Sequence, residues 1–401
     1  MEVVFISNHD KIPGEKVGFN HPLYQIDEFL NLGYNVTYVV ASFDHFTKSQ
    51  RLRRELFYQG NEKFKVVVLP SISYNDNISL KRFLSHFLFS VSVFTYVIKI
   101  KKIDVIFLAL PSPFLDIVCV FLKKIFKAEL YVDFRDLWPE LFEVYLTGFL
   151  KLISWPFIKL LYFNRYITFK NASVITAVSN TYLEIAKRSN PNALSDVVYL
   201  GYANEFIDSV GNSLKIVDGT LNVVYAGSLS HNYDVECLLS VVKRIDENYP
   251  EHKIFFHIAG SGFYDNKIEE YAAIYSKRLK FYGKLDSVNL NNLYNNCNIS
   301  LCIYDNRTLI SFPAKIFELI CKNLPIINSL QGEVGDLIEK ERLGLNYISG
   351  DDISLLSQIL VFYNNPELLT EFKGNMNRCM DYYSKENQYS KFNFLLKNKI
   401  K

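Results

Sequence analysis

The stretch Ser311-Phe-Pro-Ala-Lys-Ile-Phe-Glu-Leu-Ile-Cys-Lys-Asn-Leu-Pro-Ile-Ile327 contains the start of a helix, an amphipathic helix and the beginning of a buried strand. Pro313 suits the first turn of a helix because it lacks an N–H that would have no partner there. The run Leu324–Asn328 follows closely and has the length and apolar character of a buried strand. A helix joined closely to such a strand is the repeating unit of an α/β fold.

The same alternation of short apolar runs with helical patterns extends through the whole chain. In the first half we expect strands at Glu2–Ser7, Asn35–Ala41, Lys65–Leu69, Val105–Ala109, Glu129–Phe134, Val174–Val178 and Val197–Leu200. In the second half we expect them at Asn222–Ala226, Ile254–Ala259, Leu279–Tyr282, Ile299–Cys302, Leu324–Asn328 and Gly344–Ile348. Two such series predict an α/β protein with two doubly wound, Rossmann-like sheets.

A glycine-rich segment at 201–219 separates the two series and is typical of a linker. We therefore expect an N-terminal domain at 1–204 and a C-terminal domain at 205–380. Residues 381–401 lack a strand pattern and predict a terminal helix that packs back on the N-terminal domain.

Composition excludes several classes of protein. The chain has 401 residues, 49% of them hydrophobic, and a formal net charge of +2, so it can bury large cores and lacks the overall positive charge of a nucleic-acid-binding protein. Its six cysteines form no C-x-x-C pair, and no histidine has zinc-site spacing to them, which favours a reducing cytoplasm and predicts no metal. Residues 1–7 lack signal-peptide features, and the apolar run Phe83–Ile98 is interrupted by polar residues. We interpret that run as a buried or interfacial helix, with a membrane span as the lesser alternative.

Around Pro313 the local chemistry fits an anionic ligand. The free amides of Ala314 and Lys315 at a helix start can face a phosphate, and the Lys315 ammonium adds a positive charge. Glu318, one turn later, can present its carboxylate to the two hydroxyls of a ribose. The alternative is an ordinary capped helix with no ligand.

Glycines follow three of the expected strands, at Gly227, at Gly260 with Gly262, and at Gly283. Glycine there lets the backbone approach a ligand at the carboxyl ends of the strands, where doubly wound sheets bind nucleotides. No G-x-G-x-x-G or P-loop pattern occurs, so the dinucleotide and P-loop classes lack support. Ordinary strand-to-helix turns are the alternative explanation.

Taken in order, these glycine turns, the Pro313–Glu318 segment and Asn323-Leu-Pro-Ile-Ile327 resemble the donor half of family 4 of the retaining GT-B glycosyltransferases. In the first half, Gly33–His45, Val132–Glu140 and Ala177-Val-Ser179 resemble a bacterial branch that acts in capsule and O-antigen assembly. That branch includes N-acetyl-L-fucosamine transferases.

The resemblance implies a GT-B fold, with two Rossmann-like domains facing across a cleft. It implies transfer of a sugar, such as N-acetylfucosamine, from a UDP-sugar to a polyprenyl-diphosphate-linked sugar, with retention of configuration and without a metal or cofactor. It implies a bacterial enzyme that is cytoplasmic and peripheral on the inner face of the cell membrane, with no nucleic-acid partner.

The resemblance also implies roles for individual residues. The implied donor-binding residues are Gly227, Ser228, Gly260, Gly262, Gly283, Pro313, Ala314, Lys315 and Glu318. The implied catalytic residues are Arg135, Asp136 and Lys315, and the implied acceptor-binding residues are Gly18, Asn20 and His21.

The chain departs from the family pattern at the donor site. Ile310 stands where the first glutamate of an E-x7-E motif is expected, and no arginine or lysine follows Gly227. We hypothesise that Lys315, with His231 or Arg307, stabilises the leaving diphosphate instead.

The segment 141–170 carries Lys151, Lys159, Arg165 and Lys170 against one acid, Glu143, among many aromatic and aliphatic residues. At helical spacing its cations fall within an arc of roughly 140°, which is typical of an interfacial helix. A core helix with a polar edge is the alternative, and Pro156 is expected to kink or split the helix. The basic cluster Lys99, Lys101 and Lys102 also suits an anionic membrane surface.

Two other functions stay open. Ile310 and the missing cations fit a catalytically silent GT-B subunit that binds a partner enzyme. A nucleotide-sugar epimerase on the same fold is disfavoured because no acid/base set can be assigned. The acidic pairs Asp133/Asp136 and Glu140/Glu143 invite comparison with retaining glycosidases. We interpret these carboxylates as structural or acceptor-binding.

Overall fold

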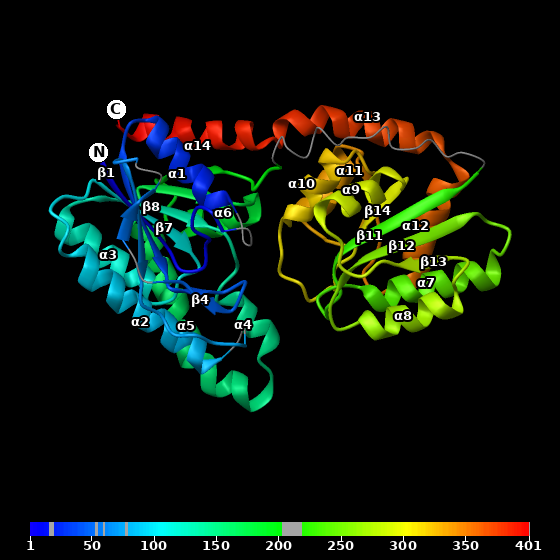
Figure 1. The fold of residues 1–401 in the computed structure, drawn as a ribbon, viewed down its shortest axis with the longest axis horizontal. Helices are drawn as coiled ribbons and strands as arrows, with labels where there is room; N and C mark the ends of the chain where they lie inside the picture. The colour runs from blue at the N-terminus through cyan, green and yellow to red at the C-terminus, as the bar shows by residue number, and fades with distance from the viewer. Residues whose placement is uncertain (16–19, 53–54, 59–60, 77–78, 203–218, 401) are drawn as a thin grey trace. The chain divides into compact units, whose positions relative to one another are not determined.

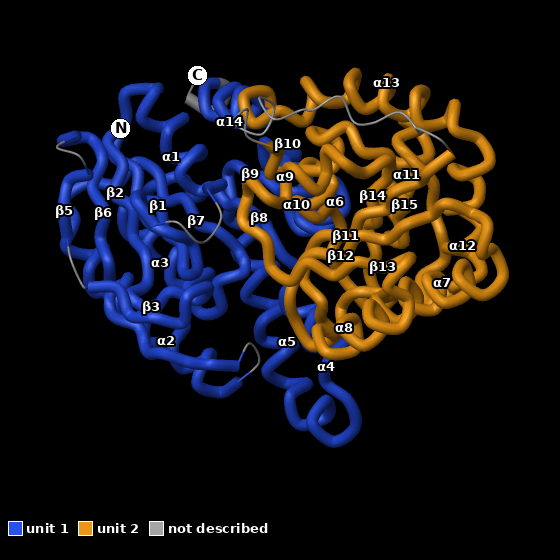
Figure 2. Tube along the Cα trace, turned by 45° about the vertical axis from the view of Figure 1, so that its right-hand side comes forward, with its two compact units in different colours: residues 1–199, 388–401 blue, residues 200–387 orange. Residues whose placement is uncertain are grey.

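The computed structural model describes residues 1–15, 20–52, 55–58, 61–76, 79–202 and 219–400, with only the backbone described at 398–400. The chain forms two compact units (Figure 2): unit 1 contains residues 1–199 and 388–401, and unit 2 contains residues 200–387. The predicted boundary between residues 204 and 205 lies outside the described residues.

Unit 1 is built on a sheet in the strand order β10-β9-β8-β7-β1-β2-β6-β5. Its strands are β1 (Glu2–Ser7), β2 (Asn35–Ala41), β5 (Glu55–Phe57), β6 (Phe64–Leu69), β7 (Val105–Leu110), β8 (Glu129–Phe134), β9 (Val174–Ala177) and β10 (Leu194–Val197). All neighbours pair in parallel except β5, which is antiparallel to β6. A short hairpin of β3 (Phe43–Asp44) and β4 (Ser49–Gln50) follows β2.

Helices cover both faces of this sheet (Figure 1), and they bury β7 completely and all of β8 except Glu129. The helices of unit 1 are α1 (His21–Asn31), α2 (Leu80–Val97), α3 (Leu115–Phe126), α4 (Glu140–Tyr145), α5 (Gly148–Asn171), α6 (Asn180–Ser189) and most of α14 (Lys385–Ile400). The expected terminal helix is present in α14, and its side chains Tyr389, Phe392 and Leu396 lie in the core of unit 1 with Phe29 of α1.

Unit 2 has a parallel sheet in the order β13-β12-β11-β14-β15-β16. Its strands are β11 (Leu221–Ser228), β12 (Ile254–Ser261), β13 (Leu279–Phe281), β14 (Ile299–Cys302), β15 (Ile326–Asn328) and β16 (Gly344–Asn346). Its helices are α7 (Val235–Asn248), α8 (Asp265–Ile274), α9 (Ser287–Asn295), α10 (Ala314–Cys321), α11 (Glu333–Lys340), α12 (Asp352–Asn364) and α13 (Glu367–Tyr382). In each unit the strands are added first on one side of the first strand and then on its other side. The strand order therefore reverses beside β1 in unit 1 and beside β11 in unit 2, as in doubly wound sheets.

Two of the expected elements differ from the structure in position or continuity. The last strand of unit 1 is Leu194–Val197, so the expected strand Val197–Leu200 is displaced toward the C-terminus. Pro156 lies inside the continuous helix α5, and the break in the expected helix falls before Gly148 instead. None of the described helices is long and apolar enough to span a membrane.

Candidate functional site

The start of α10 carries the predicted phosphate and ribose contacts in unit 2. Pro313 caps the helix with an extended backbone, and Ala314 is its first residue. The Lys315 ammonium donates to a carboxylate oxygen of Glu318 and to the Tyr294 hydroxyl, both at 2.9 Å. Lys315 and Glu318, predicted as separate ligand contacts, therefore form an ion pair with each other.

This ion pair sets the charge state of Lys315. Burial alone would lower the pKa of the Lys315 ammonium, but Glu318 and Tyr294 outweigh burial and hold that pKa above its usual range. The helix dipole opposes a cation in the first turn of α10, and the Glu318 carboxylate offsets this effect locally. Lys315 is consequently a protonated group at neutral pH, about one-fifth exposed.

The glycine turns of β11 and β12 are required by the sheet itself. Gly227 and Gly260 are register partners at the carboxyl ends of these strands. A Cβ on Gly260 would lie 1.8 Å from the Gly227 carbonyl oxygen, and a Cβ on Gly262 would lie 2.5 Å from that of Leu229. Gly283 differs, because its φ is +62° and a Cβ there would meet no described atom within 4 Å. Ser228 ends β11, and its carbonyl accepts a hydrogen bond from Tyr225.

The positions that depart from the family pattern lie in varied surroundings. The Ile310 side chain is partly exposed, and the hydroxyl of the adjacent Ser311 donates to Glu333 at 3.2 Å. The Arg307 guanidinium pairs with Asp305 at 2.6 Å, and the His231 ring packs against Phe263 with 4.0 Å between ring centroids. A role for Arg307 or His231 at the diphosphate stays a prediction.

In unit 1, Asp133 near the end of β8 is the centre of a buried polar network. Its carboxylate accepts from His21 at 3.0 Å, from Arg135 at 2.5 Å and from Thr176 at 2.5 Å. Burial alone would raise the pKa of the Asp133 carboxyl, but Arg135 and His21 outweigh burial and hold it well below its usual range. Asp133 is thus a structural carboxylate with no exposed surface.

The predicted acceptor residues divide between two environments. His21 is buried, and its ring nitrogens face Asp133 and the Tyr389 hydroxyl of α14. Burial lowers the pKa of His21 despite the Asp133 carboxylate. Asn20 is exposed at the start of α1, and Gly18 lies outside the described residues. A direct contact of His21 with an acceptor stays a prediction, because both of its ring nitrogens are engaged in this structure.

The neighbouring residues Arg135 and Asp136 have opposite surroundings. The Arg135 guanidinium also donates to Asp10 at 2.5 Å and to Gln25 at 2.9 Å, so it is held on three sides. Asp136 is exposed, and its carboxylate accepts only the Leu137 amide among the contacts described for it. Partial enclosure raises the pKa of the Asp136 carboxyl, although that amide and Arg82 oppose the rise. Asp136 is therefore the carboxylate of this strand end that a ligand can reach.

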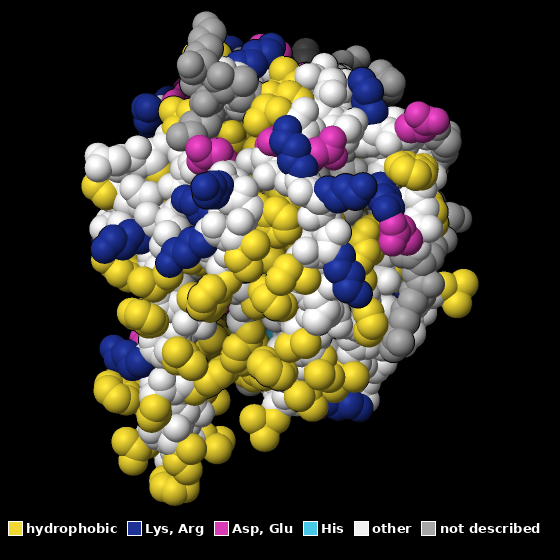
Figure 3. Space-filling view, turned by 90° about the vertical axis from the view of Figure 1, so that its left-hand side faces the viewer, with side chains coloured by type: hydrophobic (Ala, Val, Ile, Leu, Met, Phe, Trp, Pro, Cys, Tyr) yellow, Lys and Arg dark blue, Asp and Glu magenta, His cyan; other side chains and the backbone are white. Residues whose placement is uncertain are grey.

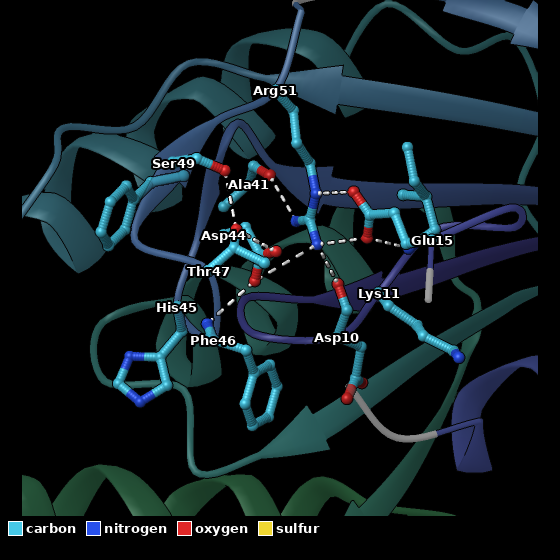
Figure 4. Close-up of polar contacts among 12 residues, drawn as sticks. Asp10, Lys11, Glu15, Ala41, Asp44, His45, Phe46, Thr47, Ser49 and Arg51 are labelled. Atoms are coloured by element: carbon cyan, nitrogen blue, oxygen red, sulfur yellow. Dashed lines mark hydrogen bonds and ion pairs between the residues drawn. The ribbon is translucent and has the colours of Figure 1, made fainter. Parts of the chain in front are cut away.

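Arg51 connects the loop that follows β1 to the end of β2 (Figure 4). Its buried guanidinium binds the Glu15 carboxylate through two nitrogens, at 2.7 and 2.8 Å. It also donates to the carbonyl oxygens of Ala41 at 3.0 Å and Asp10 at 3.1 Å. Figure 4 shows the Asp10 carboxylate pointing away from Arg51. Arg51 therefore holds the Asp10 backbone and leaves its carboxylate for Arg135.

A second polar cluster was missed in the sequence. His9 follows β1, His45 follows β3, and His86 and Arg82 lie on α2. The His9 ring lies 5.2 Å from the His45 ring and 4.9 Å from the His86 ring. A signal was present, since Asn8-His9-Asp10 and Asp44-His45 follow neighbouring strands whose carboxyl ends meet at one edge. The partners on α2 could not be inferred from spacing.

Comparisons with known proteins agree with the architecture. Residues 220–365 match the family model described as Glycosyl transferases group 1. The chain is similar to sucrose-phosphate synthase from Thermosynechococcus elongatus, with a TM-score of 0.73 and 15% identity over 100% of this chain and 99% of that chain. It is similar to Alr3699/HepE from Anabaena in complex with UDP, with a TM-score of 0.68 and 14% identity over 99% and 100% of the two chains.

A third similar structure is the apo form of the lipopolysaccharide outer core galactosyltransferase WaaB, with a TM-score of 0.63 and 15% identity over 100% of both chains. A comparison with curated protein sequences finds no match. The matched residues 220–365 contain α10 and all the predicted donor positions of unit 2. The chain thus has the GT-B fold of glycosyltransferases, with two Rossmann-like domains, and the group 1 match lies in the second of them.

Proposed function

We propose that this chain is a retaining, metal-independent glycosyltransferase of family 4 that uses a UDP-sugar. The observation that carries the proposal is the group 1 match over 220–365, which includes the Lys315–Glu318 pair at the start of α10. The similar Anabaena protein was solved with UDP, which favours this nucleotide. The resemblance of the first half to N-acetylfucosamine transferases favours an N-acetylated deoxyhexose as the sugar.

On donor binding, the Lys315–Glu318 pair separates and each member takes a part of the ligand. Glu318 turns to the ribose hydroxyls, and the Lys315 ammonium turns to the diphosphate beside the Ala314 and Lys315 amides. The two side chains are three residues apart on one helix, so they lie on the same face. Lys315, protonated at neutral pH, then opposes the negative charge that develops on the leaving diphosphate.

Transfer proceeds with retention through an oxocarbenium-like state. The C–O bond to UDP breaks, and the acceptor oxygen bonds to the same face of the sugar. The acceptor proton passes to the leaving diphosphate. Asp136 and Arg135 of unit 1 are proposed to orient the reacting groups, so the protein contributes mainly positioning and electrostatics.

The proposed acceptor is a polyprenyl-diphosphate-linked sugar of capsule or O-antigen assembly, at the cytoplasmic face of the membrane. The support is an apolar face on α2 and α5. Its exposed residues are Leu80, Leu84, Phe87, Leu88 and Val91 of α2 and Phe149, Leu150, Leu152, Ile153 and Trp155 of α5. Figure 3 shows apolar side chains gathered over a large part of the surface on this side of unit 1, with lysine and arginine around them. An apolar area with a basic border is typical of proteins that dock on anionic membranes.

The proposal is tested by the release of UDP from UDP-sugars, including UDP-N-acetyl-L-fucosamine, in the presence of a polyprenyl-diphosphate-linked sugar. Lys315→Ala is expected to lower kcat by about a hundredfold or more, because one stabilising group for the transition-state charge is lost. Lys340→Ala, an exposed cation on α11, is the matched control and is expected to leave kcat unchanged. Normal turnover by Lys315→Ala would remove the proposed role, and inversion of configuration in the product would refute the mechanism.

The catalytically silent subunit remains the second candidate, because an apolar, partly exposed Ile310 stands where a polar donor contact is expected. Such a subunit would bind a partner and turn over no donor alone.

A further inference from the structure

The histidine cluster of unit 1 contains two cations, Arg82 and Lys48. An Arg82 Nη atom lies 3.5 Å from His9 Nε2, and the Lys48 ammonium lies 5.2 Å from the centre of the Tyr74 ring. The His45 ring hydrogen-bonds the same tyrosine at 2.9 Å.

Two carboxylates, Asp44 and Asp136, lie near this cluster. Asp44 already accepts from the Phe46 amide at 2.9 Å and the Thr47 hydroxyl at 2.6 Å, and Asp136 accepts from the Leu137 amide at 2.9 Å. The histidines are held neutral, because burial and the neighbouring Arg82 lower the pKa of each. Arg82 and Lys48 therefore carry the positive charge of this cluster, and its histidines are neutral.

One buried nitrogen in this cluster has no protein partner in the part of the chain that the structure describes. The His86 side chain is 1% exposed, and its Nδ1 faces the Asn8 amide. Its Nε2 has no hydrogen-bond partner among the described residues. A buried polar atom without a partner is costly unless a ligand or water satisfies it. The unpaired His86 Nε2 atom therefore indicates that a polar group of a ligand binds beside Arg82.

An apolar pocket lies close to the cluster, because Phe83, the residue after Arg82, is part of its lining. The pocket has a volume of about 440 Å³ and is lined by apolar residues of α2, α4 and α5, with Phe114. The Arg82 guanidinium lies 4.6 Å from the Trp138 ring, and that ring packs on Phe142 at 4.8 Å. Phe142 lines the pocket as well. Arg82 and an apolar pocket of ligand size are thus connected through the packed rings of Trp138 and Phe142.

We propose that unit 1 binds a prenyl diphosphate, with the diphosphate at Arg82, His9 and His86 and the first isoprene groups in the pocket lined by Phe83, Leu84 and Phe142. This inference rests on the proposed function and gives the lipid-linked acceptor a binding site in unit 1. The Arg82 guanidinium complements the charge of the diphosphate, and the apolar lining of the pocket complements the isoprene chain. A bound diphosphate also gives His86 Nε2 a hydrogen-bond partner.

The experiment measures binding of three probes to the full chain by calorimetry: farnesyl diphosphate, farnesol and inorganic diphosphate. Arg82→Gln is expected to weaken farnesyl diphosphate and inorganic diphosphate by about tenfold or more, because a charge-assisted contact is lost. Leu84→Trp, which fills the pocket from a half-exposed position, is expected to weaken farnesyl diphosphate and farnesol and leave inorganic diphosphate unchanged.

Two variants on α2 serve as controls. Lys81→Gln removes an exposed cation next to Arg82, and Val91→Trp adds a large side chain on α2 outside the pocket; neither is expected to change binding. Equal affinities of wild type and Arg82→Gln for farnesyl diphosphate would contradict the proposed diphosphate-binding site. Equal affinities of wild type and Leu84→Trp for that probe would contradict binding of the isoprene groups in the pocket.

UDP binding to the same protein separates this inference from the proposed function. If UDP binds and farnesyl diphosphate does not, the inference fails and the glycosyltransferase proposal stands. If farnesyl diphosphate binds and is weakened by Arg82→Gln and Leu84→Trp, while neither UDP nor UDP-sugars bind, the prenyl diphosphate site stands and the proposed function fails.

Discussion

Asp133 and Asp136, three residues apart at the end of β8, are predicted to contribute differently to the stability of unit 1. Asp133→Asn is expected to lower the free energy of unfolding of unit 1 by about 3 kcal/mol, because it leaves the Arg135 charge less compensated in a buried network. Asp136→Asn is expected to change that stability little, since the side chain is exposed. Both tryptophans, Trp138 and Trp155, lie in unit 1, so their fluorescence in urea reports its unfolding. An Asp133→Asn variant as stable as wild type would contradict this account.

The histidines His9, His45 and His86 predict that the stability of unit 1 depends on pH. Burial and Arg82 lower the pKa of His45 from 6.5 to about 4, and they lower the pKa values of His9 and His86 as well. As pH falls below 6.5, the unfolded chain therefore takes up protons that the folded unit does not. Stability of unit 1 is expected to be complete above pH 6.5 and to be lost progressively toward pH 4.

Tryptophan fluorescence during urea unfolding at several pH values measures this loss. His45→Gln is expected to make the loss less steep. His252→Gln, in unit 2, is the matched control and leaves the pH dependence of unit 1 unchanged. A unit 1 whose stability is constant from pH 6.5 to 4 would contradict the buried, neutral state of these histidines.

At the residue scale, the sequence indicates contacts between residues close in the chain better than contacts across the fold. Lys315 and Glu318 were found from the helix start, and their three-residue spacing already allows the ion pair that forms. The Tyr294 contact, and the buried contact of His21 with Tyr389 from a position 368 residues away, depend on tertiary packing. No local pattern contains that information.

At the scale of elements, α5 tolerates a proline in its interior. Pro156 cannot donate to the carbonyl one turn earlier, and the first half of α5 is largely exposed. Pro156→Ala is expected to raise the free energy of unfolding of unit 1 by up to about 3 kcal/mol, as measured by tryptophan fluorescence in urea. Lys159→Ala, three residues later, is the control and is expected to have an effect under about 1 kcal/mol. A loss of stability in Pro156→Ala would show that the proline is needed by the local packing.

Buried strands were predicted to within two residues at each end, whereas short edge elements were not. Strands β1, β2, β8 and β14 have the predicted bounds, because runs buried on both faces are nearly continuous in apolar residues. The hairpin β3–β4 and the antiparallel strand β5 have two or three residues each and little apolar pattern. The shift of β10 to Leu194–Val197 arises in the same way, since its residues are only partly buried.

At the scale of the whole molecule, the apolar face of α2 and α5 predicts membrane association. The full chain is expected to float with liposomes that contain anionic lipid, because apolar side chains insert and nearby lysines attract the headgroups. A Leu152→Ser/Trp155→Ser variant is expected to bind several-fold less. A Val288→Ser variant, which removes an exposed apolar side chain of unit 2, is the control. Absence of flotation by an active protein that uses a water-soluble acceptor would remove the membrane claim.

Two doubly wound sheets could be predicted because two α/β series of similar rhythm follow one another in the chain. The GT-B fold was implied by the resemblance to family 4. The glycine turns were also predicted, and the structure gives two of these glycines a reason that does not depend on a ligand. Gly260 and Gly262 are required by the close approach of neighbouring backbone, so a glycine at a strand end is no proof of a ligand. The strongest donor signal in the sequence is therefore the segment from Pro313 to Glu318.

The central claim, a UDP-sugar site at the start of α10, is tested most directly by calorimetric binding of UDP, GDP and ADP without added metal. Wild type and Glu339→Ala, which alters an exposed carboxylate of α11, are expected to bind UDP in preference to GDP and ADP. Glu318→Ala is expected to bind UDP about tenfold more weakly, because the ribose loses a charge-assisted hydrogen bond. Failure of the well-folded wild type to bind any of the three nucleotides, or unchanged UDP affinity in Glu318→Ala, would contradict the claim.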